Sequence, residues 1–392
     1  MQVYITTQGA EVVKEARRLK VMVGRDTAGT LFLDRLEQLI VCGNVEFSHR
    51  ALAELFKRNI DTVFLSKSGR YYGRLAHAEG KNVFLRRKQF SLLDDQQFQL
   101  NVARSIVVGK MTNQATLLKR IERSKNIEIL KQTAEDLRRM ASDAAVATSL
   151  ESLLGFEGKG SALFFSGFRW GFIEDQSFRK RVRRPPTDPV NSVLSFLYTL
   201  LMNRVYTAVR LAQLDPFPGN LHALDYGRYS LVLDLMEEFR PIIADTLCLS
   251  LFNLQILRRD DFIIEEPDSD EGPAGQELEA EVSAPLPDVT KDPWGWVAPL
   301  CSSDADTFDV PEQRMEEVVE VKPEQAAKRP VVLKEDALKR VLEAFERKLT
   351  TRFYHAPSDK EITYSDALFV QAVQYRQIVE GELKVYQPIL LR

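Results

Sequence analysis

One stretch decides the helical half of the fold, SLVLDLMEEFRP at residues 230–241. Its apolar residues recur at the spacing of a helix face, and the pattern continues to residue 257, which predicts a long helix. Pro241 lies inside this helix and should kink or split it, because proline lacks a backbone N–H and clashes with the preceding turn. Within the stretch, Asp234 shares a helix face with Glu237 and with Glu238.

These three carboxylates are the first sign of a functional site. A carboxylate that is buried on an apolar helix must be paired with a cation or bound to a metal. The alternative is that all three are solvated acids on the helix surface, paired with Arg240. The spacing alone does not choose between Glu237 and Glu238.

His222 and Glu157 are two further candidates. His222 follows the turn signal PGN at residues 218–220 and precedes the carboxylate-bearing helix. An imidazole beside carboxylates is a suitable ligand set for Mn²⁺ or Mg²⁺, although a lone histidine is more often a surface or core residue. Glu157 stands in GFEG at residues 155–158, where the glycines allow a break in the helix. Taken alone, it reads equally well as a glutamate at a helix end.

The hydrophobic period changes once along the chain, near residue 90. Before it, short apolar runs punctuated by glycine predict strands, and Ser48 is a plausible N-cap for a short helix. After it, the period is helical. We therefore expect an α+β protein with a small N-terminal β-rich domain at 1–85 and a larger all-α domain at 90–260 plus 331–392. The strands are expected at 2–6, 18–23, 30–33, 38–41, 61–65 and 71–75, and helices at 48–57, 144–154, 190–211, 335–349 and 364–381.

The charge is unevenly distributed over the 392 residues. The formal net charge is −3, but residues 260–325 hold 20 acidic and 3 basic residues, which leaves +14 on the rest of the chain. A basic body favours a polyanionic partner such as nucleic acid, the alternative being a solvated basic surface. We expect 262–330 to be a disordered acidic insertion, because this composition cannot bury enough apolar area. It could compete with nucleic acid for the basic surface, the alternative being a passive linker or an arm that docks a partner.

Arginines and aromatic residues are interleaved after Glu157, a pattern that suits phosphate contacts and base stacking. The alternative is that the aromatics belong to the core and the arginines are solvated. The interleaved run contains the basic residues Arg169, Arg179, Lys180, Arg181, Arg183 and Arg184 and the aromatic residues Phe164, Phe165, Phe168, Trp170, Phe172 and Phe178.

The three cysteines are far apart and show no CxxC spacing, which fits a reducing cytoplasm.

Several motifs follow one another along the chain, and their order is specific for one protein family. Together they resemble the CRISPR-associated spacer-acquisition integrases, the endonuclease-integrase subunit of the CRISPR adaptation complex. The resemblance covers residues 1–260 and about 330–392. The motifs are KMTNQ at 110–114, GFEG at 155–158, TDPVNS at 187–192, LDPFPGNLH at 214–222, SLVLDLMEEFRP at 230–241 and YQP at 386–388.

The resemblance implies a metal site for Mg²⁺ or Mn²⁺. Glu157, His222 and Glu237 match the ligands and catalytic residues of the family, and Asp234 matches a supporting acid. This favours Glu237 over Glu238. Weaker candidates for DNA contact are Lys159, Arg179, Lys180, Arg181, Arg183, Arg184 and Tyr198.

The activity implied is the insertion of short DNA fragments into a CRISPR array, by attack of a 3′-hydroxyl on a phosphodiester. The implied partners are DNA, a second copy bound through the β domain, and a small ferredoxin-like adaptation protein in a heterohexamer. Two alternatives stay open. One is a metal-dependent nuclease or resolvase of branched DNA, and the other is a DNA-binding protein whose acids are structural.

Overall fold

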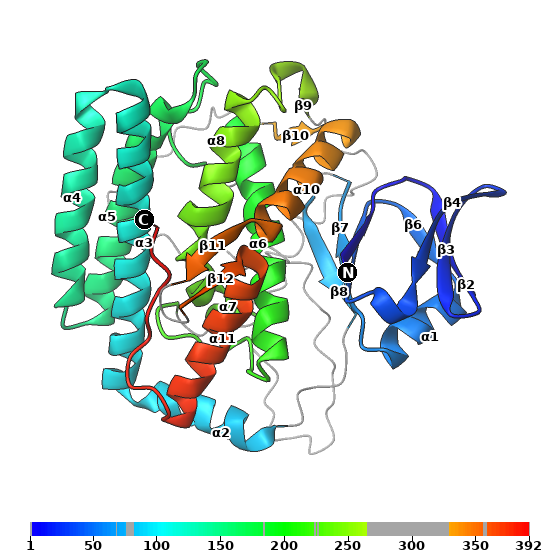
Figure 1. Ribbon diagram of the computed structural model, residues 1–392, viewed down its shortest axis with the longest axis horizontal. Coiled ribbons are helices and arrows are strands. Elements are labelled where there is room, and N and C mark those ends of the chain that lie inside the picture. Colours follow the sequence, from blue (N-terminus) through cyan, green and yellow to red (C-terminus); the bar gives the residue numbers. More distant parts are fainter. Residues whose placement is uncertain are drawn as a thin grey trace, which may run out of the picture.

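The protein consists of a β-rich N-terminal part beside a larger helical part (Figure 1). The structure is a computed structural model that describes residues 2–67, 69–75, 82–182, 185–222, 225, 227–264, 329–355 and 359–391. The α+β class expected from the sequence is confirmed. None of the helices in these ranges is long and apolar enough to cross a membrane.

Two four-stranded sheets form the N-terminal part. The first has the order β1-β5-β7-β8, with β1, β5 and β7 parallel and β8 antiparallel. The second has the order β4-β3-β2-β6, and α1 packs on its strand β2. The bounds are β1 Gln2–Ile5, β2 Ala10–Glu15, β3 Arg18–Val23, β4 Asp26–Phe32, β5 Gln38–Cys42, β6 Val45–Phe47, α1 His49–Lys57, β7 Asp61–Leu65 and β8 Tyr71–Arg74.

The sequence predicted six of these eight strands and the helix. Ser48 caps α1 as expected, since its side chain accepts a hydrogen bond from the N–H of Ala51. Strands β2 and β6 were missed, because β2 carries charged residues at three of its six positions and β6 is only three residues long.

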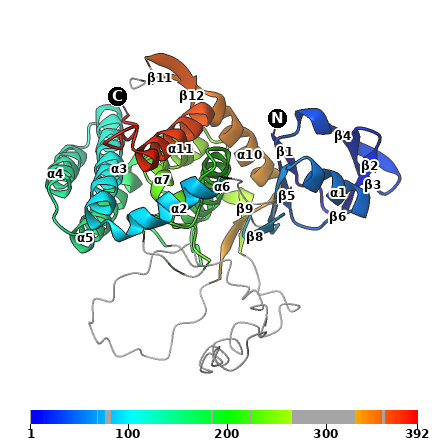
Figure 2. The same ribbon diagram turned by 90° about the horizontal axis from the view of Figure 1, so that it is seen from below.

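The helical part surrounds the central helix α6 (Figures 1 and 2). Helices α3, α4 and α5 pack on one another, and α7 and α11 pack on α6. Two small two-stranded sheets, β9-β10 and β11-β12, were not expected in an all-α domain. The bounds are α2 Val83–Ser91, α3 Gln96–Lys125, α4 Glu128–Ala145, α5 Leu150–Phe168, α6 Pro189–Leu211, α7 Ser230–Met236, α8 Thr246–Asn253, β9 Phe262–Ile264, β10 Val331–Leu333, α10 Glu335–Thr350, β11 Arg352–His355, β12 Lys360–Thr363 and α11 Tyr364–Glu380.

Two helical expectations concern the candidate site. The helix expected at 144–154 is wrong, because α4 ends at Ala145 and α5 starts at Leu150 with Ser149 as its N-cap. Glu157 therefore lies in the middle of α5 rather than at a helix end. The break expected at Pro241 is confirmed, because a π-helical segment, Arg240–Asp245, separates α7 from α8.

The segment predicted as an insertion starts and ends at a strand pair. Strand β9 pairs antiparallel with β10, so that Ile264 lies opposite Val331. Residues 262–264 are thus part of a strand, which corrects the expected start of the insertion. Residues 265–328 lie outside the described residues.

The sheet β1-β5-β7-β8 joins the two parts of the molecule. Alternate residues of β5 belong to different hydrophobic cores. Leu39 lies in the core of the N-terminal part, and Ile40 lies in the core of the helical part. Polar contacts reinforce the junction, since the Arg74 guanidinium lies 3.5 Å from the centre of the Tyr206 ring on α6. The junction thereby holds α6, on which the carboxylate-bearing helix α7 packs.

Candidate active site

Four elements bring the candidate residues together in the helical part. Glu157 comes from α5, Lys110 from α3, His222 from the loop after α6, and Asp234 and Glu237 from α7 and its C-terminal end. Helices α3 and α5 pack side by side, and α3 also contacts α7. The three ligands expected from the resemblance, far apart in the sequence, are therefore linked in one cluster through Lys110 and Glu237.

Asp234 orients His222. Its side chain is completely buried and accepts hydrogen bonds from the backbone N–H groups of Asn220, Leu221 and His222. Its Oδ1 also lies 2.7 Å from Nδ1 of His222. Because a carboxylate can only accept, the imidazole proton belongs on Nδ1 and a lone pair is left on Nε2. Nε2 faces Glu237, with 3.9 Å between it and Oε1.

Glu237 and Glu157 converge on the ammonium of Lys110. Lys110 Nζ is ion-paired with Glu157 Oε1 and lies 2.7 Å from Glu237 Oε2. Arg240 Nη1 lies 3.2 Å from the other oxygen of Glu237. Burial raises the pKa of Glu237, but the positive charges of Arg240 and Lys110 outweigh it and bring the pKa to about 2. Burial also opposes ionisation of Glu157, yet Lys110 and Ser161 hold its pKa below the usual range.

A second buried group lies behind this cluster. The Arg240 guanidinium stands 4.9 Å from the centre of the Tyr198 ring, whose hydroxyl donates a 2.6 Å hydrogen bond to Asp245. Burial raises the pKa of Asp245 to about 7. Arg240 and Asp245 are the two ends of the π-helical segment, a distortion that is frequent at functional sites.

Glu238 faces away from the cluster, toward the C-terminal segment. Its Oε1 accepts hydrogen bonds from the Tyr386 hydroxyl at 2.6 Å and from Gln371 at 3.0 Å, and its Oε2 accepts one from the N–H of Ile389. Asn113 donates to the carbonyl oxygen of Ile389. In Figure 1 this segment, drawn in red, runs along α3. Adjacent glutamates thus point to different partners.

The donor chemistry of the cluster fits a hard divalent cation. Two ionised carboxylates already hold one cation, the ammonium of Lys110. Nε2 of His222 lies near the other oxygen of Glu237, which Arg240 also approaches. In the described part of the chain, however, no three His, Cys, Asp or Glu side chains are close enough to form a ligand set as they stand. Lys110 accounts for this spacing, because its ammonium separates the two glutamates.

Lys110 and Arg240 are the site residues that sequence reasoning missed. Lys110 continues the apolar stripe of Val102 and Ile106 on α3, and a charge on such a stripe must find a partner when buried. That position was the available signal. Arg240 was considered only as a surface partner of the acids, whereas its side chain is largely buried against Glu237.

The candidates for DNA contact lie in different environments. Lys159, Arg179 and Lys180 are exposed, and Arg179 pairs with Asp175. Arg181 instead donates internal hydrogen bonds to Asn191 and Ser195, and the Tyr198 hydroxyl is bonded to Asp245 as described above. Arg183 and Arg184 lie outside the described residues.

The phenylalanines of the same run are core residues. Phe164, Phe168, Phe172 and Phe178 are buried and pack edge-on or tilted against one another. The stacking platform suggested by their interleaving with arginine is therefore wrong for these four rings. Trp170 is partly exposed, with the Arg169 guanidinium 4.9 Å from its ring.

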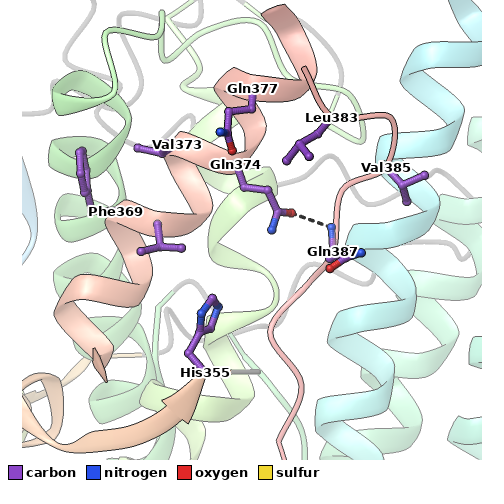
Figure 3. A pocket seen from close by; sticks show the side chains of 9 residues that line it. His355, Phe369, Val373, Gln374, Gln377, Leu383, Val385 and Gln387 are labelled. Atoms are coloured by element: carbon purple, nitrogen blue, oxygen red, sulfur yellow. Dashed lines mark hydrogen bonds between the residues drawn. The ribbon is translucent and has the colours of Figure 1, made fainter. Parts of the chain in front are cut away.

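A cavity of about 380 Å³ lies apart from the cluster, between α11 and the C-terminal segment. Figure 3 shows His355 at one end of it, and the N–H of Gln387 donating to Gln374. None of the candidate ligands lines it.

Comparison with known proteins identifies the family. The family model described as CRISPR associated protein Cas1 matches residues 3–269. The CRISPR-associated endonuclease Cas1 3 of Thermus thermophilus is 30% identical over 392 residues, which cover 100% of this chain and 97% of that protein. The CRISPR-associated endonuclease Cas1 2 of Rhodospirillum rubrum is 34% identical over 274 residues, covering 66% and 78%.

Two solved structures share the fold. A CAS1 protein from Thermotoga maritima aligns with a TM-score of 0.73 and 20% identity over 98% of this chain and 99% of that one. A casposase bound to integration product aligns with a TM-score of 0.74 and 17% identity over 98% and 92%. The family match and the curated relatives place the chain among the CRISPR-associated nucleases. It belongs to the Cas1 family.

Proposed function

We propose that the chain is a metal-dependent DNA integrase and endonuclease that inserts short DNA fragments into a CRISPR array. One observation carries the proposal. Two ionised carboxylates, Glu157 and Glu237, converge on one cation beside an imidazole that Asp234 orients. The name of the curated relatives, endonuclease, fits this chemistry, and the solved casposase of the same fold is bound to an integration product.

Glu157, His222 and Glu237 would hold Mg²⁺ or Mn²⁺. When bound, the ion supplies positive charge that stabilises the developing charge on the phosphoryl oxygens. Asp234 keeps the His222 lone pair aimed at the site, and Arg240 fixes one oxygen of Glu237. Water is excluded from the rear of the site, because Glu237 and Asp234 are almost fully buried.

The reaction balances without a protein nucleophile. The 3′-hydroxyl of the incoming fragment attacks the phosphorus of a phosphodiester in the array, a new P–O bond forms, and the proton of the hydroxyl passes to water. The bond to the 3′-oxygen of the array strand breaks, and that oxygen leaves and takes up a proton as a new 3′-hydroxyl. Water in place of the attacking hydroxyl gives hydrolysis, which is the endonuclease activity.

DNA binding is assigned first to the exposed cations Lys159, Arg179 and Lys180. Lys159 is exposed on α5, the helix that also carries Glu157. Replacing Lys159 or Lys180 with glutamine should weaken binding on every sequence and lower the slope of log K against log salt by about one. Unchanged slopes would remove these residues from the DNA surface.

The partners proposed are a second copy of the chain and a small ferredoxin-like adaptation protein, in a heterohexamer. A solved structure of a Cas6-RT-Cas1–Cas2 complex shares the fold, with a TM-score of 0.74 and 21% identity over 100% of this chain and 36% of that one. We propose a cytoplasmic location, because the described cysteines, Cys42 and Cys248, are both free and buried.

An integration assay tests the function. A supercoiled plasmid carrying a repeat array, mixed with labelled fragments, the adaptation partner and Mn²⁺, should yield joined products. Glu157→Ala, His222→Ala and Glu237→Ala should each abolish joining while helical content and DNA binding stay intact. Glu151→Ala, an exposed position on the same helix as Glu157, is the matched control and should stay active.

Two other results would reject the proposal. Nicking without joining would favour the nuclease or resolvase of branched DNA. Full activity in all three variants would show that the acids are structural.

A further inference from the structure

Lys110 occupies the position where the two candidate carboxylate ligands meet. Its side chain leaves the apolar face of α3 and is only 5% exposed. The ammonium contacts Glu157 Oε1 and Glu237 Oε2, one oxygen from each carboxylate. The second oxygen of Glu237 is held by Arg240. The ammonium therefore bridges two acids from different helices, α5 and the end of α7.

This bridge has a clear electrostatic reason. Two buried carboxylates so close together repel each other, and each would lose its hydration without compensation. A cation between them restores the balance. Arg240 contributes on one side of Glu237 only, and no basic residue other than Lys110 is recorded in contact with Glu157 among the described residues.

A divalent metal needs the same oxygens. Carboxylate oxygens bind Mg²⁺ or Mn²⁺ at roughly 2 Å, so one ion shared by Glu157 and Glu237 would take the place of the ammonium. An ammonium and a divalent ion cannot both occupy this volume, because they repel each other and compete for the same lone pairs. Metal binding must therefore move Lys110.

We propose that Lys110 is the built-in cation of the metal-free site, and that a divalent metal binds by displacing its ammonium from Glu157 and Glu237. The inference rests on the proposed metal-dependent function and adds a step to it. The metal-free protein keeps its site assembled, and metal entry releases a tethered ammonium beside the reaction centre.

Lysine reactivity tests the exchange directly. The full-length protein is treated with an amine-acylating reagent in EDTA or in Mn²⁺, and acylation of each lysine is followed by mass spectrometry. Lys110 should react slowly in EDTA and at least fivefold faster when Mn²⁺ saturates the site. Lys119, on the same helix, should react equally in both. In His222→Ala, which weakens metal binding and leaves the Lys110 pairs in place, the rise should disappear.

A variant tests the competition. Lys110→Met removes the competing cation, so it should bind Mn²⁺ at least tenfold more tightly than the wild type, as measured by electron paramagnetic resonance. In EDTA its thermal midpoint should fall, and Mn²⁺ should restore it. Lys119→Met should change neither value. Lys110→Arg retains the charge and should bind Mn²⁺ no more tightly than the wild type, which keeps the test available if Lys110→Met folds poorly.

The outcomes separate this inference from the proposed function. Saturable Mn²⁺ binding with unchanged acylation of Lys110 would overturn the exchange and leave the metal-dependent function standing. Failure of the wild type to bind Mn²⁺ at all would overturn both.

Discussion

Asp234→Asn should change the proton position on His222 more than it changes the fold. Each oxygen of Asp234 accepts two hydrogen bonds. Oδ1 serves the N–H and Nδ1 of His222, and Oδ2 serves the N–H groups of Asn220 and Leu221. Asparagine replaces one of these oxygens with an NH₂ group, which donates and cannot accept.

The two orientations of the asparagine amide have different costs. With NH₂ in the place of Oδ2, two backbone bonds are lost, at about 1.5–3 kcal/mol each for bonds to a charged group. With NH₂ in the place of Oδ1, the backbone bond of His222 is lost, but the amide can donate to Nδ1 if the imidazole proton moves to Nε2. This second orientation costs about half as much, and it leaves Nε2 without the lone pair that faces Glu237.

We therefore expect a loss of about 1.5–3 kcal/mol in the free energy of unfolding and a loss of roughly 10–100-fold in Mn²⁺ affinity. Urea unfolding in EDTA measures the first, and Mn²⁺ titration by electron paramagnetic resonance the second. Nitrogen NMR of labelled histidine reads the tautomer, which is practical because the chain has four histidines. Asp143→Asn, an exposed site on α4, is the control. Unaltered Mn²⁺ affinity in a folded Asp234→Asn protein would refute the orienting role.

Three further predictions follow from burial, close approach and strand pairing. Burial raises the pKa of Asp245 from 3.8 to about 7, so the folded protein keeps a proton that the unfolded chain has released, and stability falls as pH rises from about 4 through 7. Asp245→Asn has no carboxyl group to titrate, so urea unfolding should show it to be more stable than the wild type at pH 8 but not at pH 4. If the stability of both proteins depends on pH in the same way, the raised pKa of Asp245 is contradicted. A Cβ at Gly109 would lie 2.4 Å from Pro388, so Gly109→Ala should cost about 1–3 kcal/mol. Gly155→Ala meets nothing within 4 Å and should raise the thermal midpoint slightly. Replacing 265–330 with a two-residue turn should preserve the fold, because β9 and β10 already pair. If the acidic segment competes for the basic surface, DNA binding by this deletion should tighten; unchanged affinity would favour a passive linker.

Local patterns predicted those parts of the fold whose cause is local. The break at Pro241 follows from one missing N–H, and the cap at Ser48 from one hydroxyl. The position of Glu157 was misread because the glycines around it suggested a helix end. Gly155 and Gly158 lie instead in the interior of α5 with open space around them, so the helix continues through both.

The site could be predicted only in part, because its contacts are not local. The resemblance implied candidate ligands, but the pairing of Lys110 with Glu157 spans 47 residues and depends on how α3 packs against α5. Sequence spacing could not separate Glu237 from Glu238, since both lie on the same short helix end. Their partners separate them, because Glu237 meets Lys110 and Glu238 meets the C-terminal segment.

The long acidic segment separates α8 from α10 in the sequence, but the elements that position the site still pack together. The chain leaves at β9 and returns at β10, which are paired, so α10 and α11 start from a fixed point. Helix α11 then packs on α6, and the segment after it reaches α3, where Asn113 holds Ile389 and Gly109 lets Pro388 approach. Gly109 adjoins Lys110 in the sequence, so the C-terminal segment packs on α3 next to the residue that bridges the two glutamates. An insertion placed at this hairpin can vary in length and charge while the residues on both sides of it still build one site.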